Sequence, residues 1–369
     1  MTEEIFRFCD EYGPEKIIHF ANPAIELKGI LVIDNVAAGP AIGGTRMAPD
    51  VSVEECVRLA RAMTFKNAAA GLPHGGAKAV IFADPAMPLE KKESVIRGYA
   101  CAISEFTDYI AGPDMGTDEI AMAWVRDEIG RSVGLPREVG GIPLDEIGAT
   151  GFGLATAAEV AQEFCDVTIK GARVAIQGFG AVGKHAAQFL IERGAVLVGA
   201  SDSRGTIANP DGIDVDCLVA HKEGGKPVAD YPDGQKLSCD DIIAVPCDIW
   251  IPAARPDVLR EDNVGQLDCK MVLQGANIPA TLEAEVKLHE RGILSVPDFI
   301  ANAGGVICAS VEYHGGTETS AFATIEEKLR LNTRAVLMDA RDEKLAPRAA
   351  AIKLAGERVR RAMSLTRWG

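Results

Sequence analysis

Paired cysteine motifs, long apolar runs and an excess of basic residues are all missing from this chain of 369 residues. Its nine cysteines are scattered and form no CxxC pair, which favours reduced thiols over disulfides or a cysteine-ligated metal site. No stretch reaches the roughly eighteen apolar residues that a membrane-spanning helix needs. These absences argue against a disulfide-stabilised secreted fold, a cysteine-based metal centre and a helical membrane protein.

Positive charge is also scarce, because 38 lysines and arginines face 53 acidic residues, for a net charge of -15 at pH 7. Such a chain is a poor nonspecific ligand for nucleic acid or for anionic membranes. The segment Met1–Ile5 is acidic and lacks the apolar run of a signal peptide, so we expect a cytoplasmic protein. The length exceeds that of one typical hydrophobic core and predicts two domains.

Two lysines and an aspartate lie in apolar or glycine-rich surroundings, where a casual solvated charge is not expected. Lys66 lies in the segment AMTFKNA, Lys78 in LPHGGAK and Asp114 in GPDMGT. Burying an ammonium group without a partner is costly, and desolvation lowers the pKa of a lysine, so a buried lysine can act as a general base. A second lysine can anchor a substrate carboxylate, and an aspartate can carry a proton between them. The three residues outline a reaction site.

Apolar periodicity predicts an α/β first domain. Lys66 falls at the end of a helix predicted over 53–66. Lys78 falls at the start of a strand predicted over 79–82, after a glycine-rich turn that can bring both amines to one cleft. Thr117 is a good N-cap, with acidic residues in the first turn after it. Other predicted elements of this domain are a strand over 31–33 and helices over 90–106 and 118–129.

The stretch Gly134–Gly148 is rich in glycine and proline and looks like a domain boundary. After it, strands and helices alternate, which indicates a parallel, doubly wound sheet. The tail after Glu326 is rich in alanine, leucine and arginine and has no strand signal, so we expect it to form helices. The elements predicted after the boundary are helices over 150–164 and 182–193 and strands over 173–177, 196–200, 249–251, 271–273 and 294–296.

A GxGxxG motif follows the first of these strands and precedes a helix. Gly178 permits the tight turn, Gly180 lets the backbone approach a pyrophosphate, and Gly183 allows close helix packing. Asp202 follows Gly183 by nineteen positions, which suits a ribose 2′-hydroxyl. The alternative is a merely structural turn. Asp202 disfavours a 2′-phosphate and so favours NAD, while nearby Arg204 keeps NADP open as the alternative cofactor.

The motif divides the chain by function. We expect a substrate and catalytic domain over residues 1–145 and a Rossmann-type dinucleotide-binding domain over 146–326. The helices over 327–369 are expected to pack back on the first domain.

Short motifs that occur in order along the chain are GPAIGGTR (39–46), FKN (65–67), GGAK (75–78), PD (113–114), ATG (149–151), GAN (275–277) and NAGGV (302–306). Through them the chain resembles the glutamate/leucine/phenylalanine/valine dehydrogenase superfamily over nearly its whole length. The resemblance implies reversible oxidative deamination of an L-amino acid to its 2-oxo acid and ammonia, with hydride transfer to the nicotinamide. It also implies an N-terminal substrate domain, a Rossmann domain and a homo-oligomer.

Carried over residue by residue, the resemblance assigns roles to the polar residues of the first domain. Lys66 would bind the substrate α-carboxylate, and Lys78 would be the base that activates water against the imine. Asp114 would carry protons to and from the amine. Backbone groups of Gly43 and Gly44 would help to hold the carboxylate.

The resemblance also assigns cofactor contacts in the second domain. Thr150 would meet the nicotinamide carboxamide, although it could instead only cap its helix. Asn277 would lie where cofactor and substrate meet. Asn302 and His74 are expected to be structural. The residues expected to cradle the dinucleotide are Gly178, Phe179, Gly180, Ala181, Val182, Gly183 and Asp202.

Substrate choice depends on three small or apolar positions. Glutamate-specific members resembling this chain carry a lysine at Ile42 and a serine at Ala309, and both hold the side-chain carboxylate. Here neither position offers a partner, so an acidic side chain would be buried at a cost. Gly112 and Ala309 leave space for a branched-chain or aromatic side chain. We therefore expect an NAD-dependent dehydrogenase of apolar L-amino acids.

Two alternatives stay open. The segments Ser201–Gly205 and Asn277–Pro279 look more like the glutamate branch, which favours a glutamate dehydrogenase. A non-catalytic nucleotide-sensing protein on the same fold is the second alternative, and the intact Lys66, Lys78 and Asp114 argue against it.

Overall fold

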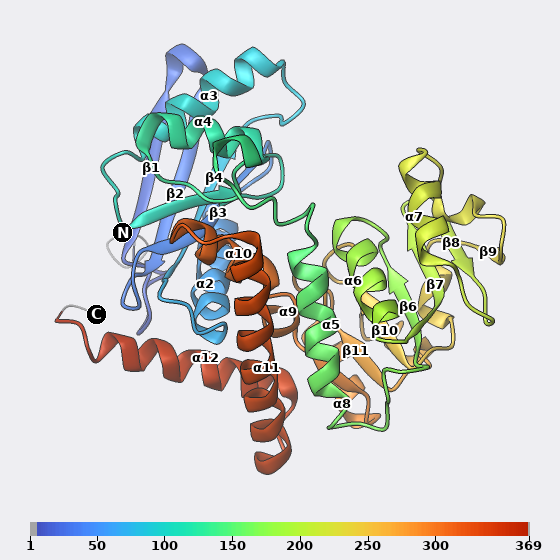
Figure 1. Ribbon diagram of the computed structural model, residues 1–369. Helices are drawn as coiled ribbons and strands as arrows, with labels where there is room; N and C mark the ends of the chain where they lie inside the picture. Colours follow the sequence, from blue (N-terminus) through green and yellow to red (C-terminus); the bar gives the residue numbers. More distant parts are fainter. Residues whose placement is uncertain (1–5, 368–369) are drawn as a thin grey trace. The chain divides into compact units, whose positions relative to one another are not determined.

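The computed structural model describes residues 6–367 (Figure 1). The acidic segment Met1–Ile5 considered above lies outside the described residues. The chain divides into two compact units: the first is Met1–Pro143 with Val306–Ala321 and Ile352–Gly369, and the second is Leu144–Gly305 with Phe322–Ala351. Among the described residues, no helix is long and apolar enough to cross a membrane.

The division of the C-terminal region differs from the prediction. We expected the helices over 327–369 to pack back on the first domain; the part from Ile352 onward does cluster with the first unit, whereas 322–351 cluster with the second. The helices α11 (Glu318–Glu343) and α12 (Pro347–Met363) each supply residues to both units. Periodicity shows that a segment is helical, but it does not show which core its apolar face packs against. For this reason the sequence did not predict that 322–351 join the second unit.

A five-stranded sheet forms the centre of the first unit, in the order β1-β2-β4-β3-β5. β1, β2 and β4 are antiparallel neighbours, whereas β3 runs parallel to both β4 and β5. The strands are β1 (Lys16–Asn22), β2 (Leu27–Asn35), β3 (Ala41–Ala48), β4 (Gly76–Phe82) and β5 (Tyr109–Pro113).

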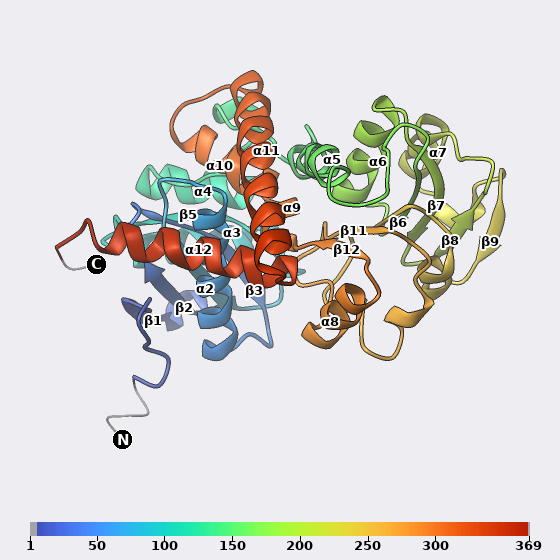
Figure 2. The same ribbon diagram turned by 90° about the horizontal axis from the view of Figure 1, so that it is seen from below.

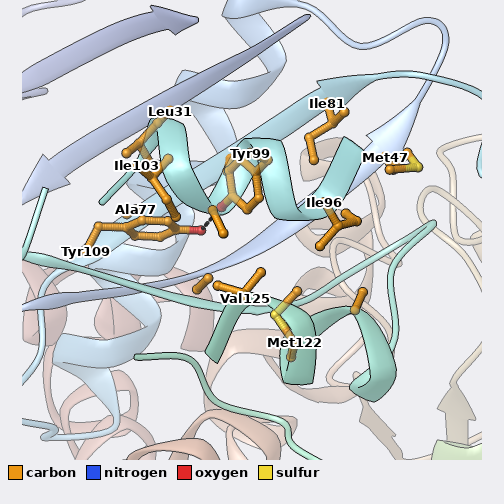
Figure 3. Close-up of a cluster of buried hydrophobic side chains, with 14 of the residues drawn as sticks. Leu31, Met47, Ala77, Ile81, Ile96, Tyr99, Ile103, Tyr109, Met122 and Val125 are labelled. Atoms are coloured by element: carbon orange, nitrogen blue, oxygen red, sulfur yellow. Dashed lines mark hydrogen bonds between the residues drawn. The ribbon is translucent and has the colours of Figure 1, made fainter. Parts of the chain in front are cut away.

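Helices cover both faces of this sheet. α3 (Leu89–Ala102) and α4 (Glu119–Ile129) bury their apolar residues against one face, in a core where the Tyr99 and Tyr109 hydroxyls lie 3.1 Å apart (Figure 3). α2 (Val53–Ala69) packs on the other face through a smaller cluster that includes Cys56 and Ala60. A site on this second face of the sheet would therefore be bordered by α2.

Two predicted caps are replaced by neighbouring residues. α4 is capped by Asp118, whose side chain accepts from the Ala121 N–H, and not by Thr117. The Thr117 hydroxyl instead donates to the Thr45 carbonyl oxygen at 2.7 Å. Thr150 does not cap its helix either, because α5 begins one residue earlier and its N-cap is Gly148.

The second unit has a seven-stranded sheet in the order β12-β11-β10-β6-β7-β8-β9, parallel from β12 to β7 and antiparallel at β8 and β9. This confirms the predicted doubly wound sheet. The strands are β6 (Arg173–Gln177), β7 (Val196–Asp202), β8 (Gly205–Ala208), β9 (Gln235–Leu237), β10 (Ile249–Pro252), β11 (Met271–Leu273) and β12 (Leu294–Val296).

Helices also lie on both faces of this second sheet (Figure 2). α6 packs on one face, where a Cβ at Gly183 would lie 3.0 Å from Ile176, and α8 packs on the other through Ala284 and Leu288. One further helix, α10, belongs to the first unit from residue Val306 onward. The helices are α5 (Ala149–Ala161), α6 (Ala181–Glu192), α7 (Val215–Glu223), α8 (Leu282–Glu290), α9 (Asp298–Ala301) and α10 (Gly304–Tyr313).

Candidate functional site

The α2-side face of the first sheet carries most of the residues predicted to meet a substrate. Because side chains alternate along a strand, every second residue of β3 and β5 lies on this face. The register pairs Ile42 with Ile110 and Gly44 with Gly112. The face therefore passes from an apolar end, through two glycines, to a charged end. Its members are Ile42, Gly44 and Arg46 from β3 and Ile110, Gly112 and Asp114 from β5 and the residue after it.

At the charged end, the structure joins two of the predicted catalytic residues. The Nζ of Lys78 lies 2.6 Å from Oδ2 of Asp114, and the Lys78 side chain is buried. Lys78 lies on β4 and Asp114 follows β5, so both reach across β3, which lies between them in the sheet. A Cβ at Gly44 would lie 2.8 Å from the Asp114 Cβ and 3.2 Å from Lys78 Nζ. The ion pair therefore depends on a glycine at position 44.

Arg46 is a partner of this pair that the sequence reasoning missed. Its Nε donates to Asp114 Oδ2 at 2.9 Å, and its Nη1 lies 2.5 Å from Glu55 Oε1 in the first turn of α2. Burial alone would raise the pKa of Asp114, but Lys78 and Arg46 outweigh it and hold the pKa below its usual range. Asp114 is thus an ionised carboxylate between two cations. The two-residue spacing of Gly44 and Arg46 could have shown that Arg46 faces the same side.

At the other end of the face lies a cluster of buried apolar side chains. Ile42, Ile110, Val133 and Ala309 form one cluster in the first unit. A Cβ at Gly112 would be 3.4 Å from Val133 Cγ2, so Gly112 borders the same cluster. The structure therefore brings together the three positions predicted to read the side chain, and adds Ile110 and Val133. Ile110 could have been found from its place two residues before Gly112, whereas Val133 lies in a loop that gives no local signal.

Lys66 lies in the last turn of α2 and is partly buried, which confirms its predicted place at the helix end. The next residue, Asn67, is fully buried and donates from Nδ2 to the Gly75 carbonyl oxygen at 2.7 Å and to that of Ile42 at 3.4 Å. Asn67 therefore ties the end of this helix to the apolar end of the sheet face. The meeting of the two lysine amines in one cleft stays a prediction.

Gly43 offers the site only backbone atoms. A Cβ there would lie 1.8 Å from the Ala77 carbonyl oxygen, so no side chain fits. The carbonyl oxygen of Gly43 accepts a hydrogen bond from the Tyr109 hydroxyl at 3.0 Å. Its position on β3 is thereby fixed from the opposite face of the sheet.

The dinucleotide fingerprint of the second unit has the geometry that its glycines predict. Gly178 has φ +96°, and a Cβ there would lie 2.6 Å from the Ala254 Cβ, so this turn requires glycine. A Cβ at Gly183 would lie 2.0 Å from the Gly178 carbonyl oxygen. Gly180 is the N-cap of α6, makes no side-chain cap bond, and has open space around it. The open helix start fits a pyrophosphate, because the first N–H groups of a helix have no partner within the helix, and Phe179, Ala181 and Val182 lie beside it.

Asp202 ends β7, and its carboxylate is held from both sides. Oδ2 lies 2.5 Å from Lys222 Nζ and 3.0 Å from the Val228 nitrogen, and Oδ1 accepts from the Arg204 N–H at 2.8 Å. Burial would raise the pKa of Asp202, but these partners lower it overall. The Arg204 guanidinium itself donates to the Gly225 carbonyl oxygen. The sequence reasoning anticipated a role for Arg204 but missed Lys222.

Thr150 and Asn277 both lie in the second unit. Thr150 is in the first turn of α5, where its hydroxyl oxygen would lie 3.1 Å from a Cβ at Gly305. Asn277 is exposed, and its Oδ1 accepts from Nδ2 of Asn302 at 3.2 Å. The same amide of Asn302 reaches the carbonyl oxygens of the two residues before Asn277, consistent with a structural part for Asn302. Among residues 6–367, no group of three His, Cys, Asp or Glu side chains is placed to hold a metal ion.

Comparison with known families and proteins gives a consistent result. Residues 140–367 match the model described as glutamate/leucine/phenylalanine/valine dehydrogenase, and residues 14–131 match the model of its dimerisation domain. A glutamate dehydrogenase of Aeropyrum pernix is 38% identical over 357 residues, which cover 90% of this chain and 85% of that protein. An NADP-specific glutamate dehydrogenase of Saccharolobus shibatae is 36% identical, covering 89% and 82%. An NAD-specific one of Staphylococcus aureus is 38% identical, covering 76% and 70%.

Solved structures add a second substrate class. The hetero-hexameric glutamate dehydrogenase of Thermus thermophilus in its leucine-bound form has a TM-score of 0.85 at 28% identity, covering 95% of this chain and 90% of that one. L-tryptophan dehydrogenase of Nostoc punctiforme has a TM-score of 0.76 at 25% identity, covering 98% and 100%. The fold is thus shared by proteins named for acidic and for aromatic amino acids.

Proposed function

Since the chain belongs to the glutamate/leucine/phenylalanine/valine dehydrogenase family, we propose that it deaminates apolar L-amino acids oxidatively with NAD. Membership of the family makes it an oxidoreductase of amino acids that uses a nicotinamide cofactor. The balanced reaction converts an L-amino acid, water and NAD⁺ to a 2-oxo acid, ammonium, NADH and a proton. The choice of an apolar substrate is the finer part of the proposal.

The observation that carries this choice is the apolar end of the sheet face. Ile42, Ile110, Val133 and Ala309 supply neither a cation nor a hydroxyl to a substrate side chain. A glutamate carboxylate placed there would lose its hydration without gaining a partner. A hydrocarbon or aromatic side chain would instead gain from leaving water. A side-chain site lined by these residues would therefore suit apolar side chains, with Gly112 leaving depth.

The charged end supplies the chemistry in this proposal. An L-amino acid over Gly44 and Gly112 would extend its side chain toward Ile42 and its amino group toward Asp114, a step of about 7 Å along the strands in each direction. Lys66 would bind the α-carboxylate, with backbone groups of the adjoining glycines beside it. These placements follow the order of residues along the face.

Proton transfer would run through the Lys78–Asp114 pair. The pair is joined by a 2.6 Å contact, so a proton can pass between them without a large movement. After its ammonium proton has passed to Asp114, the neutral amine of Lys78 would take a proton from the water that attacks the substrate imine, and Asp114 would give its proton to the departing amine. NAD held by the fingerprint residues would supply the acceptor for the hydride of the substrate Cα. Arg46 would hold the Asp114 carboxylate in place through its 2.9 Å contact with Oδ2.

NAD is the proposed cofactor, with NADP as the alternative, because relatives of both specificities exist. The proposed contacts are the fingerprint residues, Asp202, Thr150 and Asn277. The match to a dimerisation domain supports assembly of copies of this chain into a homo-oligomer.

A glutamate dehydrogenase is the second candidate, favoured by the names of relatives at 36–38% identity. Initial rates of NAD reduction across the twenty L-amino acids, repeated with NADP, separate the two. The proposal expects the highest kcat/KM for a branched-chain or aromatic amino acid. A preference for glutamate would overturn it and establish the second candidate. The Lys78→Ala variant is the control for contaminating activity.

A further inference from the structure

Glu312 on α10 is a buried carboxylate that the proposed chemistry does not use. It is 8% exposed. Its oxygens accept three backbone N–H groups. Oε1 accepts from Gly134 at 2.8 Å and Leu135 at 3.3 Å, and Oε2 accepts from Ile142 at 2.7 Å.

A carboxylate in this position has a cost, because burial disfavours its charged form. Burial raises the pKa of Glu312 overall, and the three backbone N–H groups offset this only in part. An apolar residue would avoid the cost but would leave the three buried donors without partners. The significance of Glu312 therefore lies in the segment that it holds.

That segment carries Val133, one of the four residues of the apolar cluster. Val133 immediately precedes Gly134, and its N–H donates to the Ala111 carbonyl oxygen on β5 at 2.8 Å. Gly134 has φ +72° and turns the chain against Pro113, whose Cδ would lie 2.5 Å from a Cβ there. One end of the segment is thus fixed to β5. Glu312 fixes the rest of it, as far as Ile142, to α10.

The same helix also carries Ala309, another residue of that cluster. Ala309 lies three residues before Glu312, so the two side chains point to one side of α10. Ala309 and Val133 belong to one buried cluster. A single helix therefore provides one residue of the cluster directly and holds another through a carboxylate.

We propose that Glu312 is a positioning residue that sets the width of the substrate side-chain pocket by holding Val133 opposite Ala309. The proposal deepens the proposed function, because it rests on the apolar cluster being the side-chain site. Glu312 touches neither the substrate nor the cofactor in this account. Its effect is expected on the amino-acid KM and on discrimination between side chains, not on cofactor binding.

The test is Glu312→Gln in the full-length protein. The amide keeps the shape but turns an N–H₂ group toward N–H donors, so at least one of the three bonds is lost. We expect the KM of the preferred amino acid to rise about tenfold or more, and the preference among valine, leucine and phenylalanine to narrow, since a displaced wall costs as much as a misfitted methylene. The KM for NAD should stay within about twofold.

The matched control is Glu318→Gln, which removes an exposed ion pair between α11 and Arg137 of the same segment. Exposed pairs contribute little, so its kinetics should match the wild type. If Glu312→Gln lowers thermal stability but leaves the amino-acid KM and the preference unchanged, Glu312 is only structural and the proposal is wrong. An equal effect of the control would also contradict it.

If Glu312→Gln does not fold, Glu312→Asp and Val133→Ala replace it. Both should change the preference in the same direction, and their double variant should show less than the product of the two effects, because they act on one wall. Independent effects would contradict the proposal. The measurement uses whichever amino acid the wild type prefers, so a glutamate preference would refute the proposed function and leave the role of Glu312 to be decided by KM.

Discussion

The dinucleotide fingerprint of the second unit and the apolar pocket of the first unit are built in opposite ways. The fingerprint lies within the six consecutive residues Gly178–Gly183, and its geometry follows from three glycines. The pocket collects Ile42, Ile110, Val133 and Ala309 from two strands, a loop and a helix. The class of cofactor can be predicted from one continuous motif, whereas the proposed substrate preference depends on residues that are far apart in the sequence. Family likeness alone therefore predicts the first better than the second.

The largest effect is expected from removing the proposed base, which should lower turnover and leave the dinucleotide fingerprint intact. Lys78→Ala should lower kcat by about 10²–10⁴-fold, the range that general acid–base groups contribute, because the base is lost. NAD affinity, measured by fluorescence titration, should stay near the wild-type value. Asp114→Asn should act similarly. Turnover close to wild type in Lys78→Ala would remove the assigned role.

Loss of the carboxylate anchor should act mainly on substrate binding. Lys66→Ala removes a charge-assisted contact worth roughly 1.5–3 kcal/mol, so the amino-acid KM should rise about 10- to 100-fold. Steady-state kinetics with NAD held saturating provide the measurement. A change confined to the KM for NAD would show that Lys66 is not the anchor.

A substitution that adds volume at Gly112 tests the proposed side-chain site. A Cβ at Gly112 would meet Val133 Cγ2 at 3.4 Å, an ordinary contact, so Gly112→Ala should fold normally. The added methyl group should shift the ratio of kcat/KM values from phenylalanine toward valine by about tenfold. Equal losses on both substrates would show that Gly112 does not set the depth of the pocket.

The smallest effect is expected at the ribose. Asp202→Ala leaves Lys222 without its carboxylate, and a lone cation attracts a 2′-phosphate, so NADP use should gain about fivefold relative to NAD. The double variant Asp202→Ala/Lys222→Ala is the control and should lose most of that gain. An unchanged ratio of kcat/KM values in the single variant would show that Asp202 does not read the ribose.

Local patterns predicted the elements well because their causes are local. The strand over 173–177 has the predicted bounds, and the helix predicted over 53–66 extends by three residues to Ala69. The cap at α4 was wrong by one residue, since Thr117 and Asp118 are both good caps and only tertiary contacts occupy the Thr117 hydroxyl.

The missed residues depend on contacts far apart in sequence. Arg46 meets Asp114 across 68 positions, and Glu312 meets Ile142 across 170. The strand spacing places Arg46 on the same face as Gly44 but does not show its partner, and no local pattern marks Glu312. Ile42 and Ala309 were found only because the resemblance pointed to them, and Val133 had no such guide.

The central claim is that the apolar cluster selects an apolar side chain, and one measurement tests it most directly. The ratio of kcat/KM for leucine or phenylalanine to kcat/KM for glutamate is measured with NAD in the wild type and in Ile42→Lys/Ala309→Ser. The account predicts a ratio well above one in the wild type and a shift toward glutamate of at least about tenfold in the variant, because a buried carboxylate gains a cation and a hydroxyl. A wild-type ratio below one, or a ratio unchanged by the double substitution, would contradict it.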